Sequence, residues 1–320
     1  MGQWVNMLGV IVGVLLIAAV GAAARRAGLL NRQADQSILR VMLNVLMPAL
    51  VLSVIPGNPK LQSAGNVLVP PAVGFATVTG GFAIAWLAAR LLKGSTGLTE
   101  PRARRTFAFC TGVYNYSFVP LPLAMTLFDS GTAGVLFVHN LGVEVAIWTL
   151  GIVLVSGSLG QRWYLRLLNV PILAIAGALL LHVTGAYVYI PQFLKRHTIE
   201  PLGQMFVPMA LLMVGATVAD EFEDASFIAG WRLIGLASVL RQILLPALFL
   251  LVALLPLTHE LKAVIALQAA MPAAVLPVVL TRHYGGDVTT AVRVAVGTAV
   301  ISLLATPLWL TLGFWLLGLR

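Results

Sequence analysis

Two stretches decide the fold: Asn115-Tyr116-Ser117-Phe118-Val119-Pro120-Leu121-Pro122 in the first half of the chain, and Pro272-Ala273-Ala274-Val275-Leu276-Pro277 in the second. Each interrupts a run that is otherwise apolar enough to cross a bilayer. The first stretch continues to Thr126 and Gly131, and the second continues, 155 positions later, to Thr281 and Gly286. A proline inside a membrane helix removes a backbone hydrogen bond that hydrocarbon cannot replace. The matched pair predicts two broken helices in equivalent places, whereas a simple kink is the plainer alternative for one isolated helix.

The composition is that of an integral membrane protein. Hydrophobic residues make up 59% of the 320 residues, charged residues make up 10%, and the mean hydropathy is +0.96. Soluble domains carry about 25% charged residues. Continuous apolar runs predict helices, because barrel strands would alternate apolar and polar residues. Ten runs are long enough to cross roughly 30 Å of hydrocarbon: 5–24, 38–55, 67–92, 106–128, 132–156, 170–189, 202–219, 231–255, 261–280 and 288–317.

These runs predict an all-α, polytopic membrane protein with a single domain over residues 1–320. Five spans lie in each half, in repeats of about 1–156 and 167–320. An odd number of spans per half makes equivalent helices run in opposite directions, which is an inverted repeat. Asn44 before Pro48 and Gln204 before Pro208 support this repeat, since both place an amide four residues before a proline.

Charge placement predicts the orientation. Arginine and lysine concentrate in the connections after odd-numbered spans, so the positive-inside rule puts both termini outside the cytoplasm of a multi-pass inner-membrane protein. The acidic residues Asp220, Glu221, Glu223 and Asp224 then lie on the cytoplasmic side. The net charge of +9 reflects loops that face an anionic leaflet and predicts no nucleic-acid partner.

The candidate substrate site surrounds the two breaks. Half-helices that begin at a break have a partly positive N-terminus, which attracts anions. Amide and hydroxyl side chains nearby could contact such a ligand, or could instead only hold helices together. The candidates are Asn115, Ser117, Pro120, Pro122, Asn140, Gln268, Pro272 and Pro277.

Glu144 and Arg241 lie about halfway along their spans. An unpaired charge in hydrocarbon is costly, so we expect both to face protein or water and to form a direct or water-bridged pair. The pair could fix helix packing, or Glu144 could gain and lose a proton or an ion during transport. His139 could titrate near neutral pH or could simply be packed. The histidines have no metal-ligand spacing, and we expect no metal and no cofactor.

Gly9 and Gly13 form a small-residue pattern that more often indicates close helix packing within a fold than dimerisation.

The chain resembles the auxin efflux carrier family, which belongs to a larger group with the bile-acid sodium symporters. The resemblance runs nearly end to end, and it is carried by residues 44–50, 115–122, 138–140, 148–151, 207–216 and 271–274. It implies crossed broken helices four and nine, and a mobile domain of helices 3–5 and 8–10. That domain would move like an elevator against a scaffold of helices 1, 2, 6 and 7. It also implies a small organic anion as substrate, such as an auxin-like or dicarboxylic acid, and a homodimer.

The resemblance places Asn115 and Asn140 among amides near the central site, and Pro122 and Pro277 at the crossover. Pro120 stands where the family usually has a small residue. Gln268 does not match the sodium-binding carboxylate of the bile-acid group, so a sodium-coupled symporter is the less favoured mechanism. The alternative to a carrier is a membrane receptor or channel-like protein that binds an organic anion without cycling. The chain has no plausible nucleophile and base pair for an enzyme.

Overall fold

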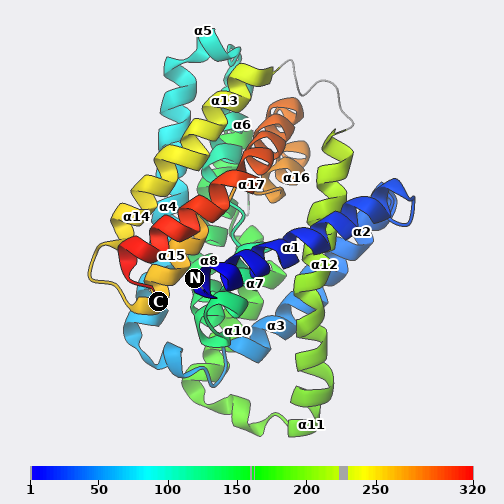
Figure 1. Ribbon diagram of the computed structural model, residues 1–320, viewed down its shortest axis with the longest axis vertical. Coiled ribbons are helices and arrows are strands. Elements are labelled where there is room, and N and C mark those ends of the chain that lie inside the picture. The colour runs from blue at the N-terminus through cyan, green and yellow to red at the C-terminus, as the bar shows by residue number, and fades with distance from the viewer. Residues whose placement is uncertain (1, 159–160, 162, 223–229, 320) are drawn as a thin grey trace.

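The computed structural model describes residues 2–158, 161, 163–222 and 230–319. Within these residues the chain is helical, and the only extended pairing is an isolated bridge between Tyr114 and Ala273. The all-α prediction is therefore confirmed. In Figure 1, α4 (Ala64–Leu91) and α12 (Glu200–Phe222) follow the long axis, while α1 (Gly2–Arg26) and α17 (Val288–Leu317) cross the view obliquely.

The remaining helices complete the bundle. The α-helices are α2 (Arg32–Val41), α3 (Met47–Val54), α5 (Lys93–Thr96), α6 (Pro101–Gly112), α7 (Pro120–Leu127), α8 (Ser130–Ala146), α9 (Ile152–Ser156), α10 (Val170–Thr184), α11 (Gln192–Leu194), α13 (Trp231–Val239), α14 (Leu245–Ala253), α15 (His259–Ala269) and α16 (Leu276–His283). Short π-helical turns join several of them: η1 (Met42–Leu46) leads into α3, η3 (Ile147–Gly151) follows α8, and η8 (Leu240–Leu244) joins α13 to α14. Such turns often occur at functional sites.

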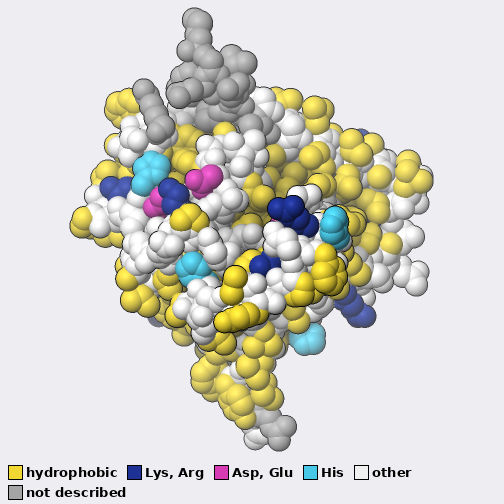
Figure 2. Space-filling model, turned by 90° about the horizontal axis from the view of Figure 1, so that it is seen from below, with side chains coloured by type: hydrophobic (Ala, Val, Ile, Leu, Met, Phe, Trp, Pro, Cys, Tyr) yellow, Lys and Arg dark blue, Asp and Glu magenta, His cyan; other side chains and the backbone are white. Residues whose placement is uncertain are grey.

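Several helices are long and apolar enough to cross a membrane. Six qualify among the described residues: Gln33–Val54, Ala64–Leu91, Ser130–Ser156, Gln192–Thr217, Trp231–Ala253 and Val288–Leu317. Val170–Thr184 is a shorter apolar helix. In Figure 2, hydrophobic side chains surround the rim of the end that is seen, and charged side chains on this face are few. The protein is therefore a multi-pass membrane protein, and the count of ten spans stays a prediction.

Both predicted breaks are present, and prolines begin the second half of each helix. The first break covers residues 113–119 between α6 and α7, and the second covers 270–275 between α15 and α16. Pro120 and Pro122 lie in the first turn of α7, and Pro277 lies in the first turn of α16. Helix N–H groups in the first turn have no partner within the helix, so a proline costs no hydrogen bond there. The prolines therefore start the second half-helices without disrupting them.

The two breaks cross and bond to each other. The N–H of Asn115 donates to the carbonyl of Pro272 (2.8 Å), and the N–H of Ala274 donates to the carbonyl of Val113 (2.9 Å). The N–H of Ala273 donates to Thr298 Oγ1 (3.1 Å). Backbone N–H and C=O groups of an unwound segment inside a membrane must form hydrogen bonds with protein, and the bonds between the two breaks supply several of these.

Glycines bring helices into close contact, although not at the predicted positions. A Cβ at Gly142 of α8 would lie 1.8 Å from the carbonyl oxygen of Pro71 in α4, and one at Gly215 of α12 would lie 1.7 Å from that of Ala18 in α1. Nothing lies within 4 Å of a Cβ at Gly9 or Gly13, so the packing predicted there was wrong.

The predicted acidic cluster is described only in part. The carboxylate of Asp220 lies 3.2 Å from Nε of Arg25, which ties the end of α12 to the end of α1. Glu223 and Asp224, together with the side chain of Glu221, lie outside the described residues.

Candidate functional site

A cavity of about 270 Å³ lies beside the crossing. The first break and α8 contribute part of its wall, and the start of α16 contributes another part. The second break, α2, η1, α3, η3, α10 with its N-cap Asn169, and α12 also contribute lining residues. Its lining residues are Leu39, Leu43, Asn44, Met47, Asn115, Tyr116, Ser117, Phe118, Glu144, Trp148, Asn169, Val170, Pro171, Phe206, Ala274, Val275, Leu276 and Val279. Apolar walls with a few polar groups are typical of small-molecule sites.

Three of the predicted site residues line this cavity, namely Asn115, Ser117 and Glu144. The others lie outside its wall: Pro120, Pro122, His139, Asn140, Arg241, Gln268, Pro272 and Pro277. Asn115 also accepts a hydrogen bond at Oδ1 from the N–H of Phe118 (3.1 Å), so its side chain holds the shape of the break that carries it.

The amides of Asn140 and Gln268 converge on one backbone carbonyl of the first break. Asn140 Nδ2 donates to the carbonyl oxygen of Tyr116 (2.8 Å) and to Ser117 Oγ (3.2 Å). Gln268 Nε2 donates to the same carbonyl (3.1 Å) and to Asn140 Oδ1 (3.2 Å). These bonds connect α8, α15 and the first break behind the cavity wall. In this structure both amides brace the unwound backbone.

Glu144 is a buried carboxylate on the cavity wall, with 3% of its surface exposed. The hydroxyl of Tyr116 donates to its Oε1 (2.7 Å), and the indole N–H of Trp148 donates to its Oε2 (2.7 Å). Trp148 lies one helical turn after Glu144, so the two side chains share a face. Each carboxylate oxygen is therefore held by a neutral donor.

Arg241 is completely buried on the π-helical turn η8. Its Nε donates to the carbonyl of Met271 in the second break (3.1 Å), and its guanidinium lies over the rings of Tyr114 (5.3 Å) and Phe249 (5.2 Å). Nη1 and Nη2 have no hydrogen-bond partner among the described residues. Met271 and Tyr114 each follow the C-terminal end of a half-helix, α15 and α6 respectively. Partly negative helix ends and aromatic faces both stabilise a cation, so they supply the favourable charge around Arg241.

Of the direct or water-bridged pair expected between Glu144 and Arg241, the direct form is not present, and the water-bridged form stays a prediction. Each side chain has its own partners on a different part of the crossing. His139 is buried as well, and its Nδ1 lies 3.4 Å from Oδ1 of the neighbouring Asn140. It packs behind the cavity wall beside the Tyr114 ring.

The helices that begin after the two breaks, α7 and α16, differ in the N–H groups at their first turns. In α7, Pro120 and Pro122 have no N–H, and the N–H of Leu121 donates to the carbonyl of Ser117 (3.2 Å). In α16, the first residue, Leu276, lines the cavity, and its N–H has no acceptor among the described residues. Of the two partly positive N-termini expected at the breaks, the one of α16 therefore has an N–H without an acceptor at the cavity.

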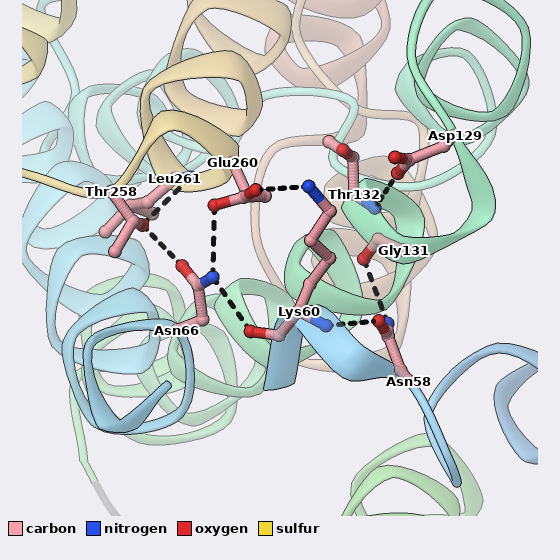
Figure 3. Close-up of polar contacts among 9 residues, drawn as sticks. All are labelled: Asn58, Lys60, Asn66, Asp129, Gly131, Thr132, Thr258, Glu260 and Leu261. Carbon is pink, nitrogen blue, oxygen red and sulfur yellow. Dashed lines mark hydrogen bonds and ion pairs between the residues drawn. The ribbon is translucent and has the colours of Figure 1, made fainter. Parts of the chain in front are cut away.

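A second polar cluster joins helix ends away from the cavity (Figure 3). Lys60 Nζ lies 2.7 Å from Glu260 Oε1, and Asn66 Nδ2 donates to Glu260 Oε2 (3.2 Å). Asn58 Nδ2 donates to the carbonyl of Gly131 (3.0 Å). Burial alone would raise the pKa of the Glu260 carboxyl, but the hydrogen bond from Lys60 and its positive charge, with the bond from Asn66, hold that pKa below its ordinary value. The hydrogen bond to Glu260 raises the pKa of Lys60.

No group of three or more potential metal ligands occurs among the residues that the structure describes. Tyr116 and Trp148 as partners of Glu144, and Asn169 as a cavity residue, were not predicted from the sequence. Helical spacing from Glu144 could have identified Trp148. The break that positions Tyr116 and the start of α10 that positions Asn169 have no comparable periodic signal.

Comparisons with known proteins relate the chain to membrane transporters. A family model described as "Membrane transport protein" matches residues 7–164 and 158–310. The chain is also 26% identical over 311 residues to an "Uncharacterized transporter" of Methanothermobacter thermautotrophicus, and the match covers 93% of this chain and 96% of that protein.

Proposed function

Because the chain belongs to the membrane transport protein family, that of the auxin efflux carriers, we propose that it is a secondary transporter of a small organic acid. The observation that carries the proposal is the cavity at the crossing of two broken helices. Many secondary transporters bind substrate between such half-helices. A volume of about 270 Å³ suits a small acid of the auxin-like or dicarboxylic class.

The cavity wall supports an amphipathic acid. The N-terminus of α16 at Leu276 carries partial positive charge, which favours a carboxylate. The amides of Asn44 and Asn115 can donate hydrogen bonds to it. Phe118 and Phe206, whose ring centroids lie 6.0 Å apart, offer an apolar surface for the rest of the molecule.

Counterflow in proteoliposomes tests this proposal. Vesicles loaded with one unlabelled carboxylate should take up the same labelled carboxylate in a saturable way, across a panel of aromatic and aliphatic mono- and dicarboxylates. Ala274→Phe, which fills the cavity, should block the exchange, whereas Val239→Phe on the exposed face of α13 should not. Binding without exchange would favour the receptor or channel-like alternative. Exchange of amines but of no carboxylate would refute the organic-acid assignment.

The mechanism that we propose is alternating access by an elevator movement. The predicted spans 3–5 and 8–10 (residues 67–156 and 231–317) would move against spans 1, 2, 6 and 7 (residues 5–55 and 170–219), in a homodimer with both termini outside the cytoplasm. The family supports the movement and the dimer, and the loop charges support the orientation. Arg241 already places a fixed positive charge against the second break, which supports a cycle without sodium.

A further inference from the structure

Glu144 is the only acidic or basic side chain among the described residues that line the cavity. It is 3% exposed, and its two oxygens are held at 2.7 Å by Tyr116 and Trp148. No lysine, arginine or histidine lines the same space. A carboxylate without a counter-charge thus shares the cavity in which an organic acid would bind.

The surroundings of Glu144 leave it free to change charge. On its own helix the nearest titratable group is His139, which packs against Asn140 and Tyr114. The first break contributes the Tyr116 hydroxyl, while η1, α10 and the start of α16 contribute no charged side chain to the cavity wall. Arg241 does not line the cavity, and its Nε donates to the carbonyl of Met271. No ion pair among the described residues fixes Glu144 in its ionised form.

The two hydrogen bonds to Glu144 can serve both protonation states. The indole N–H of Trp148 can only donate, so it stays on one oxygen in either state. The Tyr116 hydroxyl donates to the ionised carboxylate, but a hydroxyl can also accept. When Glu144 is protonated, its O–H can donate to Tyr116 after that hydroxyl rotates. A proton can therefore be held on Glu144 while both of its oxygens stay hydrogen-bonded.

An anion in the cavity makes protonation of Glu144 favourable. Two negative charges about 4 Å apart in a site of intermediate dielectric weaken binding by roughly a hundredfold to a thousandfold. Protonation of Glu144 removes this repulsion, so anion binding and proton binding must strengthen each other. Release on the opposite side reverses both steps.

We propose that Glu144 carries one proton together with each organic acid, so that the protein is a proton-coupled symporter. This inference rests on the proposed function. The cycle balances: the ionised carboxylate takes a proton on one side, the anion binds, both cross, and the anion and the proton leave on the other side. Net charge transfer is zero for a monocarboxylate.

Three measurements on purified protein test the proposal. In weakly buffered detergent solution with a pH indicator, addition of the transported carboxylate should cause uptake of up to one proton per bound anion. Wild-type affinity should fall about tenfold per pH unit above the titration of Glu144. In proteoliposomes, an acidic exterior should drive accumulation above the ratio reached without a gradient.

Glu144→Gln should abolish the proton uptake and the response to the gradient, and should make affinity independent of pH. Glu260→Gln, in the cluster of Figure 3, is the matched control and should behave like wild type in all three measurements. If Glu144→Gln does not fold, the proton uptake by the wild type on carboxylate binding tests the proposal by itself. Wild-type exchange without proton uptake or gradient response would overturn the inference, as would a Glu144→Gln protein that keeps the gradient response. Absence of any carboxylate exchange by the wild type would instead overturn the proposed function.

Discussion

Gly142→Ala should strongly destabilise the packing of α8 against α4. A Cβ at this position would lie 1.8 Å from the carbonyl oxygen of Pro71, 2.6 Å from its carbonyl carbon and 2.8 Å from the nitrogen of Phe75. All three are backbone atoms of α4, so no side chain can rotate away. Restoring ordinary contact requires the two helices to separate by roughly 1.5 Å, which breaks close packing along their length.

The size of the effect follows from two opposing terms. Overpacking typically costs about 1–3 kcal/mol, and a clash with backbone belongs at the upper end of that range. Alanine in a helix recovers about 0.5–1 kcal/mol relative to glycine. The net loss should therefore be about 2 kcal/mol or more. Gly80→Ala, on the partner helix α4, is the control. Nothing lies within 4 Å of a Cβ at Gly80, so only the gain in helix propensity applies.

Thermal unfolding in detergent, followed by fluorescence and size-exclusion chromatography, measures the difference. Gly142→Ala should lower the midpoint clearly, and Gly80→Ala should leave it equal or slightly higher. If the two variants melt together, the close contact of α4 and α8 at Gly142 is refuted.

Three further predictions concern the cavity, the second polar cluster and the topology. Asn115→Ala should weaken carboxylate binding by about 0.5–1.5 kcal/mol and should also lower the melting temperature, because the Phe118 N–H loses its acceptor; unaltered affinity would remove Asn115 from the site. Lys60→Ala should cost at most about 1 kcal/mol, because the Lys60 side chain is 41% exposed. Since the pKa of Glu260 is lowered and that of Lys60 is raised, this cost should be constant from about pH 5 to 9 and should be lost as the pH falls through the lowered pKa of Glu260; a cost that does not fall in acid would contradict the pairing. Cysteine at Leu29 should react with an impermeant reagent only from the cytoplasmic side and cysteine at His197 only from outside, over a silent background from the buried Cys110; the reverse pattern would overturn the orientation.

The features that local sequence controls were predictable. Run lengths and hydropathy located the helices, and the matched prolines marked both breaks, because a proline removes a helix hydrogen bond and fits best in a first turn. A single proline is not sufficient for a break, since Pro71, Pro208 and Pro307 lie inside α4, α12 and α17. The positions of Glu144 and Arg241 within apolar runs showed that both are buried. The class of membrane protein followed from the same run lengths and hydropathy. The family followed from the resemblance that the residues around both breaks carry.

The partners of those residues depended on tertiary structure. Gln268 reaches a carbonyl 152 positions away at Tyr116, and Arg241 bonds to Met271 and stacks on Tyr114, so the expected direct pair with Glu144 does not form. Hydropathy shows that a charge is buried, but it does not show which neighbour meets it. Likewise, nothing lies within 4 Å of a Cβ placed at Gly9 or Gly13, while a Cβ at Gly142 would meet the Pro71 backbone. Which face of a helix turns inward, and which helix crosses it, depends on the packing of segments distant in the chain, and that packing also determines which side chains line the cavity.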